Sequence, residues 1–392
     1  MKNVVIVEAK RTPIGSFGGN LASLTAPELG ASAIHEVITS SGIKPDQVQE
    51  IVMGNVLSAG VGQAPARQAA NKAGLSQKTP STTINKVCAS GMKAIMIAAD
   101  QIALGQNDIM VAGGMESMSN VPYYLDKHRF GSKLGHASAK DGIIRDGLWD
   151  VYNDFHMGNA GEICAKECNI SREEQDEFAI TSYKRAIEAH KSGAFDDEVI
   201  TMKIKGRKGN VSEIRMDEEL DRVNFDKIPS LRPVFDKEGT ITAANASSIN
   251  DGAAAVLLMS EEKAKDLNLN PLARIVSHSS AAKAPEWFTT APSDAIPIAL
   301  NKAGVSKEDI DLFEINEAFS VVSLANNQIL ELNPEKVNIH GGAVSIGHPI
   351  GCSGARIVVT LIHALKTQSQ KLGCAGICNG GGGASALVIE ML

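Results

Sequence analysis

Residues 85–92, Asn-Lys-Val-Cys-Ala-Ser-Gly-Met, begin a pattern that occurs twice in this chain. After Ser90-Gly91, apolar side chains recur at helical spacing, and a strand and the pair Gly113-Gly114 follow. At an offset of 263 residues, Ser353-Gly354 also opens a helix that is followed by a strand and by the run Gly380–Gly383. The nearly constant offset predicts a duplicated α/β unit.

The two copies differ in length, and the difference locates an insertion. In the second copy the glycines lead directly into a last strand, whereas in the first copy more than 130 residues precede the matching strand at Asp251–Met259. The sequence therefore predicts an N-terminal half (residues 1–117 plus 247–269), an inserted loop domain (residues 118–246) and a C-terminal half (residues 270–392). Because β-rich runs alternate with helical patterns, both halves are expected to be α/β with buried sheets.

Composition excludes several classes of protein. A formal net charge of -7 argues against general nucleic-acid binding. No run of 18 apolar residues occurs, so no membrane span is expected. Six cysteines are too few for a disulfide scaffold, which favours a reducing compartment. Val4–Val7 has the pattern of a strand rather than of a targeting peptide, so the cytoplasm is expected, or the mitochondrial matrix if this numbering omits a transit peptide.

Cys88 is the first candidate for chemistry. It lies between a strand and the start of an apolar helix, where unpaired N–H groups and the helix dipole favour a thiolate and lower its pKa. On this segment alone, a small buried cysteine at a strand–helix joint is equally compatible with the pattern.

Two further glycine-rich segments and one strand end carry polar or reactive side chains. His348 stands between a glycine and a proline on a rigid turn, and the repeat places it opposite Cys88 across a pseudo-twofold axis. Cys378 ends a strand and precedes four glycines, whose exposed N–H groups suit an oxyanion hole. Asn316 follows another strand, where it either orients a water or substrate or forms the strand-end turn.

Two other patterns allow competing binding sites. Two cysteine pairs have a spacing compatible with zinc: Cys164 with Cys168, and Cys374 with Cys378. Their surroundings are apolar and contain no neighbouring histidine, so zinc is the weaker interpretation. A basic run in the inserted segment allows phosphate binding, although a solvated face is the commoner meaning of such a run. Its residues are Lys203, Lys205, Arg207 and Lys208.

Three motifs, taken in order, resemble the thiolase superfamily over the whole chain: Asn85–Met92, Asn338–Gly354 and Cys378–Ala386. Thr83–Met96 and Gly341–Ile357 look closely like acetoacetyl-CoA thiolases. The resemblance implies a five-layer α-β-α-β-α arrangement of two similar halves, with a loop domain inserted in the first. It also implies an acetyl-CoA C-acetyltransferase, which condenses two acetyl-CoA molecules and catalyses the reverse thiolysis.

The resemblance assigns a role to each reactive residue. Cys88 takes the acetyl group, His348 deprotonates it, and Asn316 with a water and His348 forms one oxyanion hole. Cys378 removes the α-proton of the second acetyl-CoA. The backbone N–H groups of Cys88 and Gly380 form the second hole. The substrates are CoA thioesters, and no covalently bound cofactor is implied.

The family's CoA contacts carry over mainly to the inserted domain: His156, Met157, Tyr183, Arg222, Val223, Asn224, Lys227 and Ser247. Tyr183 and Phe288 also resemble a mitochondrial-type subclass that accepts 2-methylacetoacetyl-CoA. In that subclass a potassium ion is bound, and the matching positions are Tyr183 and the carbonyl groups of Ala243, Ala244, Ala246 and Val344. The family further implies a homotetramer, a dimer of dimers, with Val121–Ile143 as its tetramerisation loop.

Other functions stay open at this stage. A degradative 3-ketoacyl-CoA thiolase for longer chains has the same residues. A condensing ketoacyl synthase uses His or Asn where this chain has Cys378, so it fits less well. A non-catalytic lipid-carrier protein of the same fold is expected to have lost a reactive residue, and all four are present here.

Overall fold

The computed structural model describes residues 1–206 and 209–392. The strands of its large sheet are β1 (Val4–Arg11), β2 (Gly15–Ser16), β3 (Glu50–Gly54), β4 (Ser81–Ile84), β5 (Ile109–Ser117), β12 (Asn250–Ser260), β13 (Ala273–Ala282), β14 (Leu312–Ile315), β15 (Leu372–Asn379) and β16 (Gly383–Met391). The α-helices are α1 (Ala26–Ser41), α2 (Pro65–Lys72), α3 (Ser90–Ala103), α4 (Met157–Glu167), α5 (Arg172–Ser192), α6 (Glu261–Asp266), α7 (Pro292–Ala303), α8 (Ser320–Leu330), α9 (Ala343–Ile346) and α10 (Ile350–Thr367). None of the helices in these ranges is both long and apolar enough to cross a membrane.

The strand order of the sheet repeats, as the duplicated sequence pattern predicts. The full order is β14-β15-β16-β13-β1-β12-β5-β3-β4, with β2 paired to β12. Within it, β3-β5-β12-β1 matches β14-β15-β16-β13: the first pair is parallel and the next two are antiparallel in both. Within the sheet, the described strands of the two halves are joined where Val5 and Ile6 of β1 pair with β13. The predicted α/β fold of two similar halves is therefore confirmed, whereas the residue limits of the three domains stay a prediction.

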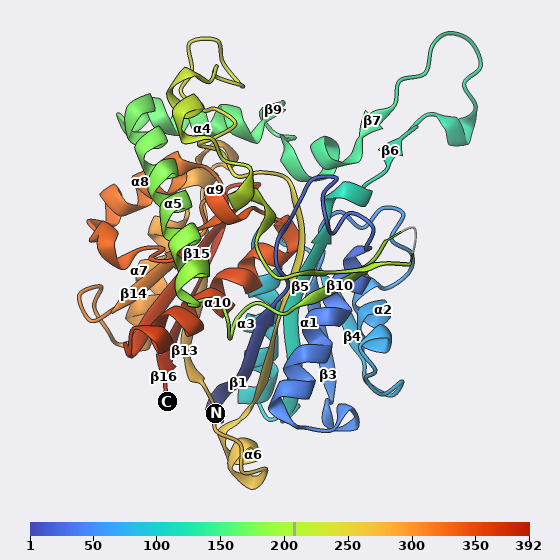
Figure 1. Ribbon diagram of the computed structural model, residues 1–392, viewed down its shortest axis with the longest axis vertical. Helices are drawn as coiled ribbons and strands as arrows, with labels where there is room; N and C mark the ends of the chain where they lie inside the picture. The colour runs from blue at the N-terminus through green and yellow to red at the C-terminus, as the bar shows by residue number, and fades with distance from the viewer. Residues whose placement is uncertain (207–208) are drawn as a thin grey trace.

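The apolar clusters separate the chain into five layers. α3 and α10 are buried between the two halves of the sheet and share one cluster with strands of both, which includes Met92, Ile95 and Leu361. α1 and α2 cover the outer face of the first half, and α7 covers that of the second. Figure 1 shows α3 and α10 between the α1–α2 side and the α7–α8 side. The predicted α-β-α-β-α arrangement is confirmed.

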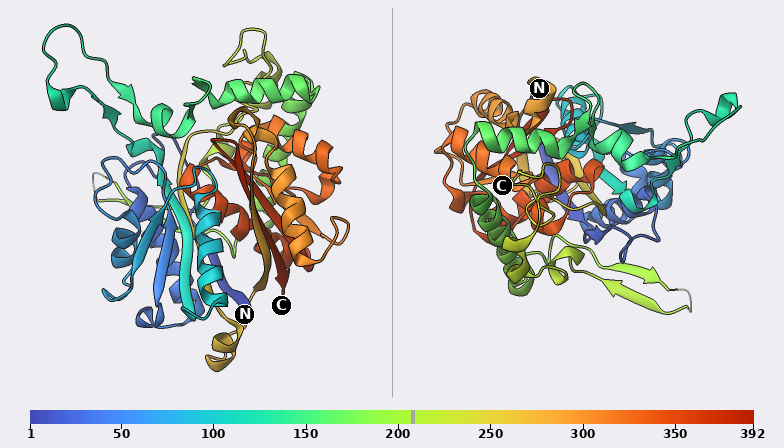
Figure 2. Two further views of the ribbon diagram at one scale, coloured as in Figure 1. Left: turned by 180° about the vertical axis from the view of Figure 1, so that it is seen from behind. Right: turned by 90° about the horizontal axis from the view of Figure 1, so that it is seen from above.

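The insertion between β5 and β12 contains α4, α5 and three two-stranded sheets: β6 (Tyr123–Tyr124) with β7 (Lys140–Asp141), β8 (Trp149–Asp150) with β9 (Phe155–His156), and β10 (Met202–Lys205) with β11 (Val211–Ile214). Figure 2 shows that the β6–β7 arm and the β10–β11 hairpin project from the body. Lys203 pairs across the hairpin with Glu213 at 3.7 Å, and both side chains are exposed, as on a solvated face. Arg207 and Lys208 lie outside the described residues.

Candidate active site

The N-terminal ends of α3 and α10 meet at two glycines. A methyl group on Gly91 would lie 2.6 Å from the backbone nitrogen of Ala355, and one on Gly354 would lie 2.5 Å from that of Met92. Neither position has room for a side chain. Because the Cys88 turn precedes α3 and the His348 turn precedes α10, this crossing brings the two turns together.

We expect Gly354→Ala to destabilise the protein and to lower activity, since overpacking against backbone costs roughly 1–3 kcal/mol and separates the two helices. Thermal unfolding and steady-state kinetics check this result. Gly304→Ala is the control for packing, because Gly304 ends α7 with open space around it. At φ 73° its alanine is strained and lowers stability, but it leaves the site intact. Wild-type stability and activity in Gly354→Ala would contradict the account.

The turn that carries Cys88 is strained and held by hydrogen bonds. Val87 has φ +47°, a left-handed conformation that is costly for a β-branched residue. Its N–H donates to Asn85 Oδ1 at 2.8 Å, and its carbonyl accepts the Ser90 hydroxyl at 2.6 Å. Ser90 Oγ also accepts the N–H of Lys86 at 2.8 Å. The turn thus fixes the direction of the Cys88 side chain.

Burial, not the helix dipole, governs the Cys88 thiol. Burial raises the pKa of Cys88 to about 11, opposed by the N–H groups of Gly380 and of Cys88 itself. The predicted lowering of its pKa is therefore wrong for the free site, because burial outweighs the two N–H groups. Burial also raises the pKa of Cys378 well above its ordinary value, and the next cause is the charge of Cys88. The Cys88 thiol is thus close enough to raise the pKa of Cys378.

His348 is held as a neutral base with one free nitrogen. Its backbone N–H donates to Asn250 Oδ1 at 2.8 Å, and its Nδ1 lies 2.6 Å from Ser353 Oγ. The Ser353 hydroxyl donates to the carbonyl of Pro349 at 3.0 Å, so it accepts from Nδ1–H. Nε2 then carries the lone pair, and it is buried without a partner among the described residues. Burial and, second, the charge of Arg356 lower the pKa of His348 to about 3.

Asn316 offers an unused amide group. It is fully buried, and neither its Oδ1 nor its Nδ2 has a hydrogen-bond partner within residues 1–206 and 209–392. Its backbone N–H donates to the carbonyl of Gly376 at 2.9 Å. The next residue, Glu317, accepts the Asn338 amide at 2.9 Å and the Ser182 hydroxyl at 2.7 Å. Because a buried amide without partners is costly, a ligand or water is expected at Asn316.

Gly380 marks the place where three segments meet. A methyl group on it would lie 3.5 Å from Val87 and 3.9 Å from Met157. Cys378, two residues earlier on β15, is buried in an apolar cluster with Met157 and Phe288. The nucleophile turn, the inserted segment and the second-half glycine turn therefore surround one position.

The residues expected to contact CoA fall into two groups. Near the cysteines, His156 precedes α4, stacks on Phe235 with ring centroids 4.7 Å apart, and has its pKa lowered by burial. Ser247 Oγ donates to the carbonyl of Ala318 at 2.8 Å, beside Asn316. Farther along the insertion, Arg222, Asn224 and Lys227 are exposed. Val223, between the first two, is half-buried. Arg222 and Lys227 form no ion pair with any described residue.

The residues expected to surround potassium lie partly together. Tyr183 and Val344 are buried in the same apolar cluster, and burial raises the pKa of Tyr183 to about 12. Ala243 is exposed and Ala244 and Ala246 are half-buried. The structure thus places two of the five residues, Tyr183 and Val344, in one cluster.

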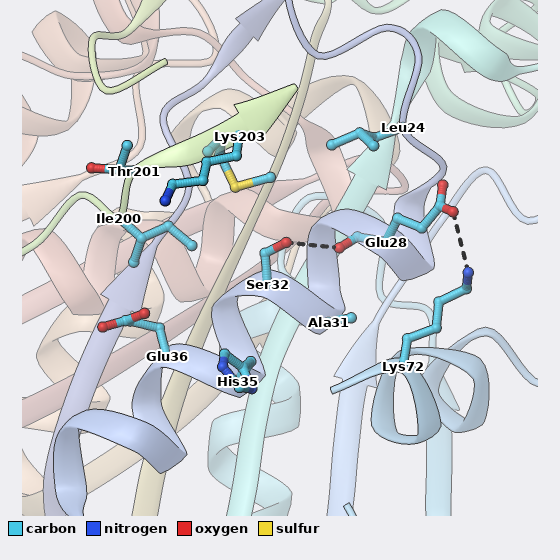
Figure 3. A pocket seen from close by; sticks show the side chains of 11 residues that line it. Leu24, Glu28, Ala31, Ser32, His35, Glu36, Lys72, Ile200, Thr201 and Lys203 are labelled. Atoms are coloured by element: carbon cyan, nitrogen blue, oxygen red, sulfur yellow. Dashed lines mark hydrogen bonds and ion pairs between the residues drawn. The ribbon is translucent and has the colours of Figure 1, made fainter. Parts of the chain in front are cut away.

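The zinc pattern finds no support in the described ranges. Cys164 Sγ lies 4.0 Å from Cys168 Sγ, but no group of three or more His, Cys, Asp or Glu side chains is placed to hold a metal there. A surface cavity of about 590 Å³ lies between α1, α2 and β10 (Figure 3). Its wall includes the ion pair of Glu28 and Lys72 at 3.1 Å and contains none of the cysteines. It is therefore not the site of the chemistry described above.

Comparison with known families accounts for this arrangement. The thiolase N-terminal domain matches residues 4–262, and the thiolase C-terminal domain matches residues 269–391. The chain belongs to the thiolase family. It is 56% identical over 392 residues to a probable acetyl-CoA acetyltransferase of Dictyostelium discoideum, covering 100% of this chain and 95% of that one. It is 56% identical to the mitochondrial acetyl-CoA acetyltransferase of Mus musculus (100% and 92% covered) and 53% identical to a cytosolic one of Gibberella zeae (99% and 98%).

Solved thiolase structures have the same fold. The acetyl-CoA acetyltransferase of Bacillus anthracis superposes with a TM-score of 0.98 at 44% identity, covering 100% of this chain and 99% of that one. The Acat5 thiolase of Ascaris suum, in complex with coenzyme A, superposes with a TM-score of 0.94 at 45% identity and full coverage of both chains.

Proposed function

We propose that this thiolase is an acetyl-CoA C-acetyltransferase that condenses two acetyl-CoA molecules to acetoacetyl-CoA and CoA, and catalyses the reverse thiolysis. One observation carries the proposal: Gly380 brings the Cys378 segment to the Cys88 turn, and His348 Nε2 and the Asn316 amide are buried without partners among the described residues. Full-length relatives named acetyl-CoA acetyltransferase support it over a longer-chain 3-ketoacyl-CoA thiolase and over a non-catalytic lipid carrier.

The first step makes an acetyl-cysteine. The thiol proton of Cys88 passes to His348 Nε2, and the sulfur attacks the thioester carbonyl of acetyl-CoA. The N–H groups of Cys88 and Gly380 stabilise the oxyanion. The bond from carbon to the CoA sulfur then breaks, and the departing CoA thiolate takes the proton of Cys378. This leaves acetylated Cys88, protonated His348 and the thiolate of Cys378.

The second step makes the carbon–carbon bond. The Cys378 thiolate removes an α-proton from a second acetyl-CoA, and Asn316 with a water and His348 stabilises the enolate oxygen. The enolate carbon attacks the acetyl group, the bond to the Cys88 sulfur breaks, and His348 returns its proton to that sulfur. Because its pKa is raised, the Cys378 thiolate is a strong base once formed.

Residues 118–246 are proposed as the loop domain that binds most of the CoA molecule. His156, Met157 and Ser247 are proposed to contact the pantetheine near the cysteines, together with Tyr183 and Phe288. The exposed cations Arg222 and Lys227, without ion-pair partners among the described residues, suit the CoA phosphates. Val223 and Asn224 are proposed to line the same surface.

Potassium is proposed at Tyr183 and the carbonyl groups named above. The carbonyls of Ala243 and Ala244 accept no hydrogen bond from the described residues, and carbonyl oxygens suit a monovalent cation. The ion would brace the loops beside His348. We expect higher activity in potassium chloride than in sodium chloride at matched ionic strength, with turnover of 2-methylacetoacetyl-CoA. Equal rates in the two salts would remove the cation site, and no turnover of the methylated thioester would remove the substrate proposal.

A homotetramer is proposed, with the β6–β7 arm as its contact. Phe130 is 85% exposed and Leu134 100% exposed at the arm's end, whereas soluble proteins rarely expose such groups together. Replacing both by serine is expected to yield a smaller oligomer in sedimentation. Leu104→Ser, at the exposed end of α3, is the control. An unchanged sedimentation coefficient in the double variant would contradict the proposal.

For the compartment, the cytoplasm is proposed.

A further inference from the structure

Lys86 lies two residues before Cys88, and its side chain crosses into the second half of the molecule. Its Nζ donates to Ser385 Oγ at 2.7 Å and to Ser280 Oγ at 2.9 Å. It also donates to the carbonyl of Ala384 at 3.1 Å. One side chain thus uses all three donors of its ammonium group on the ends of β13 and β16.

The strand register ties these acceptors to Cys378. Ser280 and Ser385 are direct partners in the β13–β16 ladder. Ala384 is the direct partner of Cys378 in the β15–β16 ladder. Lys86 therefore links the two cysteines: its backbone lies two residues before Cys88, and its side chain bonds to Ala384, the strand partner of Cys378.

The environment of Lys86 is unusual for a structural lysine. No described carboxylate forms an ion pair with it. Among charged groups, α3 presents Lys93, and farther along β13 His278 is bonded to Asp100 of α3. The acceptors that β13 and β16 give Lys86 are the two serine hydroxyls and the Ala384 carbonyl. The charged residues of these strands, Arg274 and Glu390, lie at their other ends and pair with each other at 3.1 Å. Burial and, second, the charge of Lys93 lower the pKa of Lys86 to about 8.

The crossing of α3 and α10 does not by itself fix the spacing of the two cysteines. The crossing of α3 and α10 at Gly91 and Gly354 positions Cys88 relative to His348. Cys378 lies on β15, outside that crossing. Two contacts relate the Cys88 turn to Cys378: Gly380 lies against Val87, and Lys86 bonds to Ala384, the strand partner of Cys378. The strained φ of Val87 leaves the turn dependent on such links.

We propose that Lys86 is a positioning residue that sets the distance between Cys88 and Cys378, and that it thereby serves the carbon–carbon bond step more than acetyl transfer. The inference rests on the proposed function. In acetyl transfer Cys378 only gives a proton to the leaving CoA thiolate, which water can also supply, whereas condensation needs Cys378 beside the acetyl group. A misplacement of about 1 Å between reacting groups can cost roughly 100-fold in rate.

The test compares the two steps in the full-length protein. Acetylation of Cys88 is followed in a single turnover by quenching and mass spectrometry, and condensation by acetoacetyl-CoA formation. Lys86→Met is expected to keep acetylation within about threefold and to lose condensation roughly 10- to 100-fold. Lys86→Arg restores part of the loss because it keeps charge and donors. Lys93→Met, a neighbouring lysine without these bonds, keeps both steps at pH 7.

The pH profile gives a second readout that does not depend on Lys86→Met folding. Wild-type condensation is expected to fall as Lys86 loses its proton above pH about 8, and Lys86→Arg removes this loss. Lys93→Met shifts it to higher pH. Equal losses of both steps in Lys86→Met, or the same alkaline loss in Lys86→Arg, would overturn the inference. A wild-type protein that does not condense acetyl-CoA would instead refute the proposed function.

Discussion

Cys378→Ala is expected to retain acetylation of Cys88 and to lose condensation by roughly 10²–10⁴-fold, the contribution typical of a general base. Without the Cys378 thiolate, the α-proton of the second acetyl-CoA stays in place. Cys88 and His348 still form the acetyl-cysteine, because the CoA thiolate can depart as an anion and take its proton from water. Exchange of the α-protons of acetyl-CoA with deuterated water, followed by NMR, measures the lost function directly.

Cys374→Ala is the matched control for this variant. Cys374 is also fully buried on β15, but it packs in the apolar cluster of α7 instead of beside Met157 and Phe288. Its replacement is expected to lower stability and to keep α-proton exchange. If Cys378→Ala condenses acetyl-CoA at nearly the wild-type rate, Cys378 is structural and the proposed mechanism is wrong.

His348→Ala is expected to lose both steps by roughly 10²–10⁴-fold, because Nε2 is the acceptor for the Cys88 proton and later returns it. The pH dependence should reflect its environment. Since burial lowers the pKa of His348 to about 3, the free base is neutral above that pH. The acid limb of kcat/KM therefore should not show an ordinary histidine pKa near 6.5.

His340→Ala is the control, since His340 is a second buried histidine in the same glycine-rich segment. Its ring packs edge-on against Phe195 at 5.7 Å, and its loss should lower stability without removing acetylation. Wild-type acetylation in His348→Ala, or an acid limb near pH 6.5 that His348→Ala abolishes, would contradict the assigned base.

The fold was predictable because it is encoded twice. The matched Ser-Gly pairs at Ser90 and Ser353, with the strands after them, are local patterns, so they can be recognised from the sequence alone. The start of α10 was not placed correctly: the helix begins at Ile350, before Ser353. Its glycines resemble a loop in sequence, but they are required by the close approach of α3, which only tertiary packing reveals.

The reactive residues could be predicted from sequence motifs, but the residues that hold them in place by hydrogen bonds could not. The hydrogen bond of Ser353 to His348 spans five residues, and a serine at that spacing is a usable signal only once the helix start is known. Asn250 and Glu317 act through contacts between distant segments. The pKa of Cys88 was predicted in the wrong direction, since sequence shows the nearby helix and not the burial around the thiol.

The most direct test of the central claim is to incubate the protein with acetyl-CoA labelled in its acetyl group, quench it with acid and locate the label by peptide mass spectrometry. The account predicts one labelled peptide, with the acetyl group on Cys88, and release of the label as acetoacetyl-CoA when more acetyl-CoA is added. A label found only on another residue, or none on Cys88 while acetoacetyl-CoA is still formed, would contradict it.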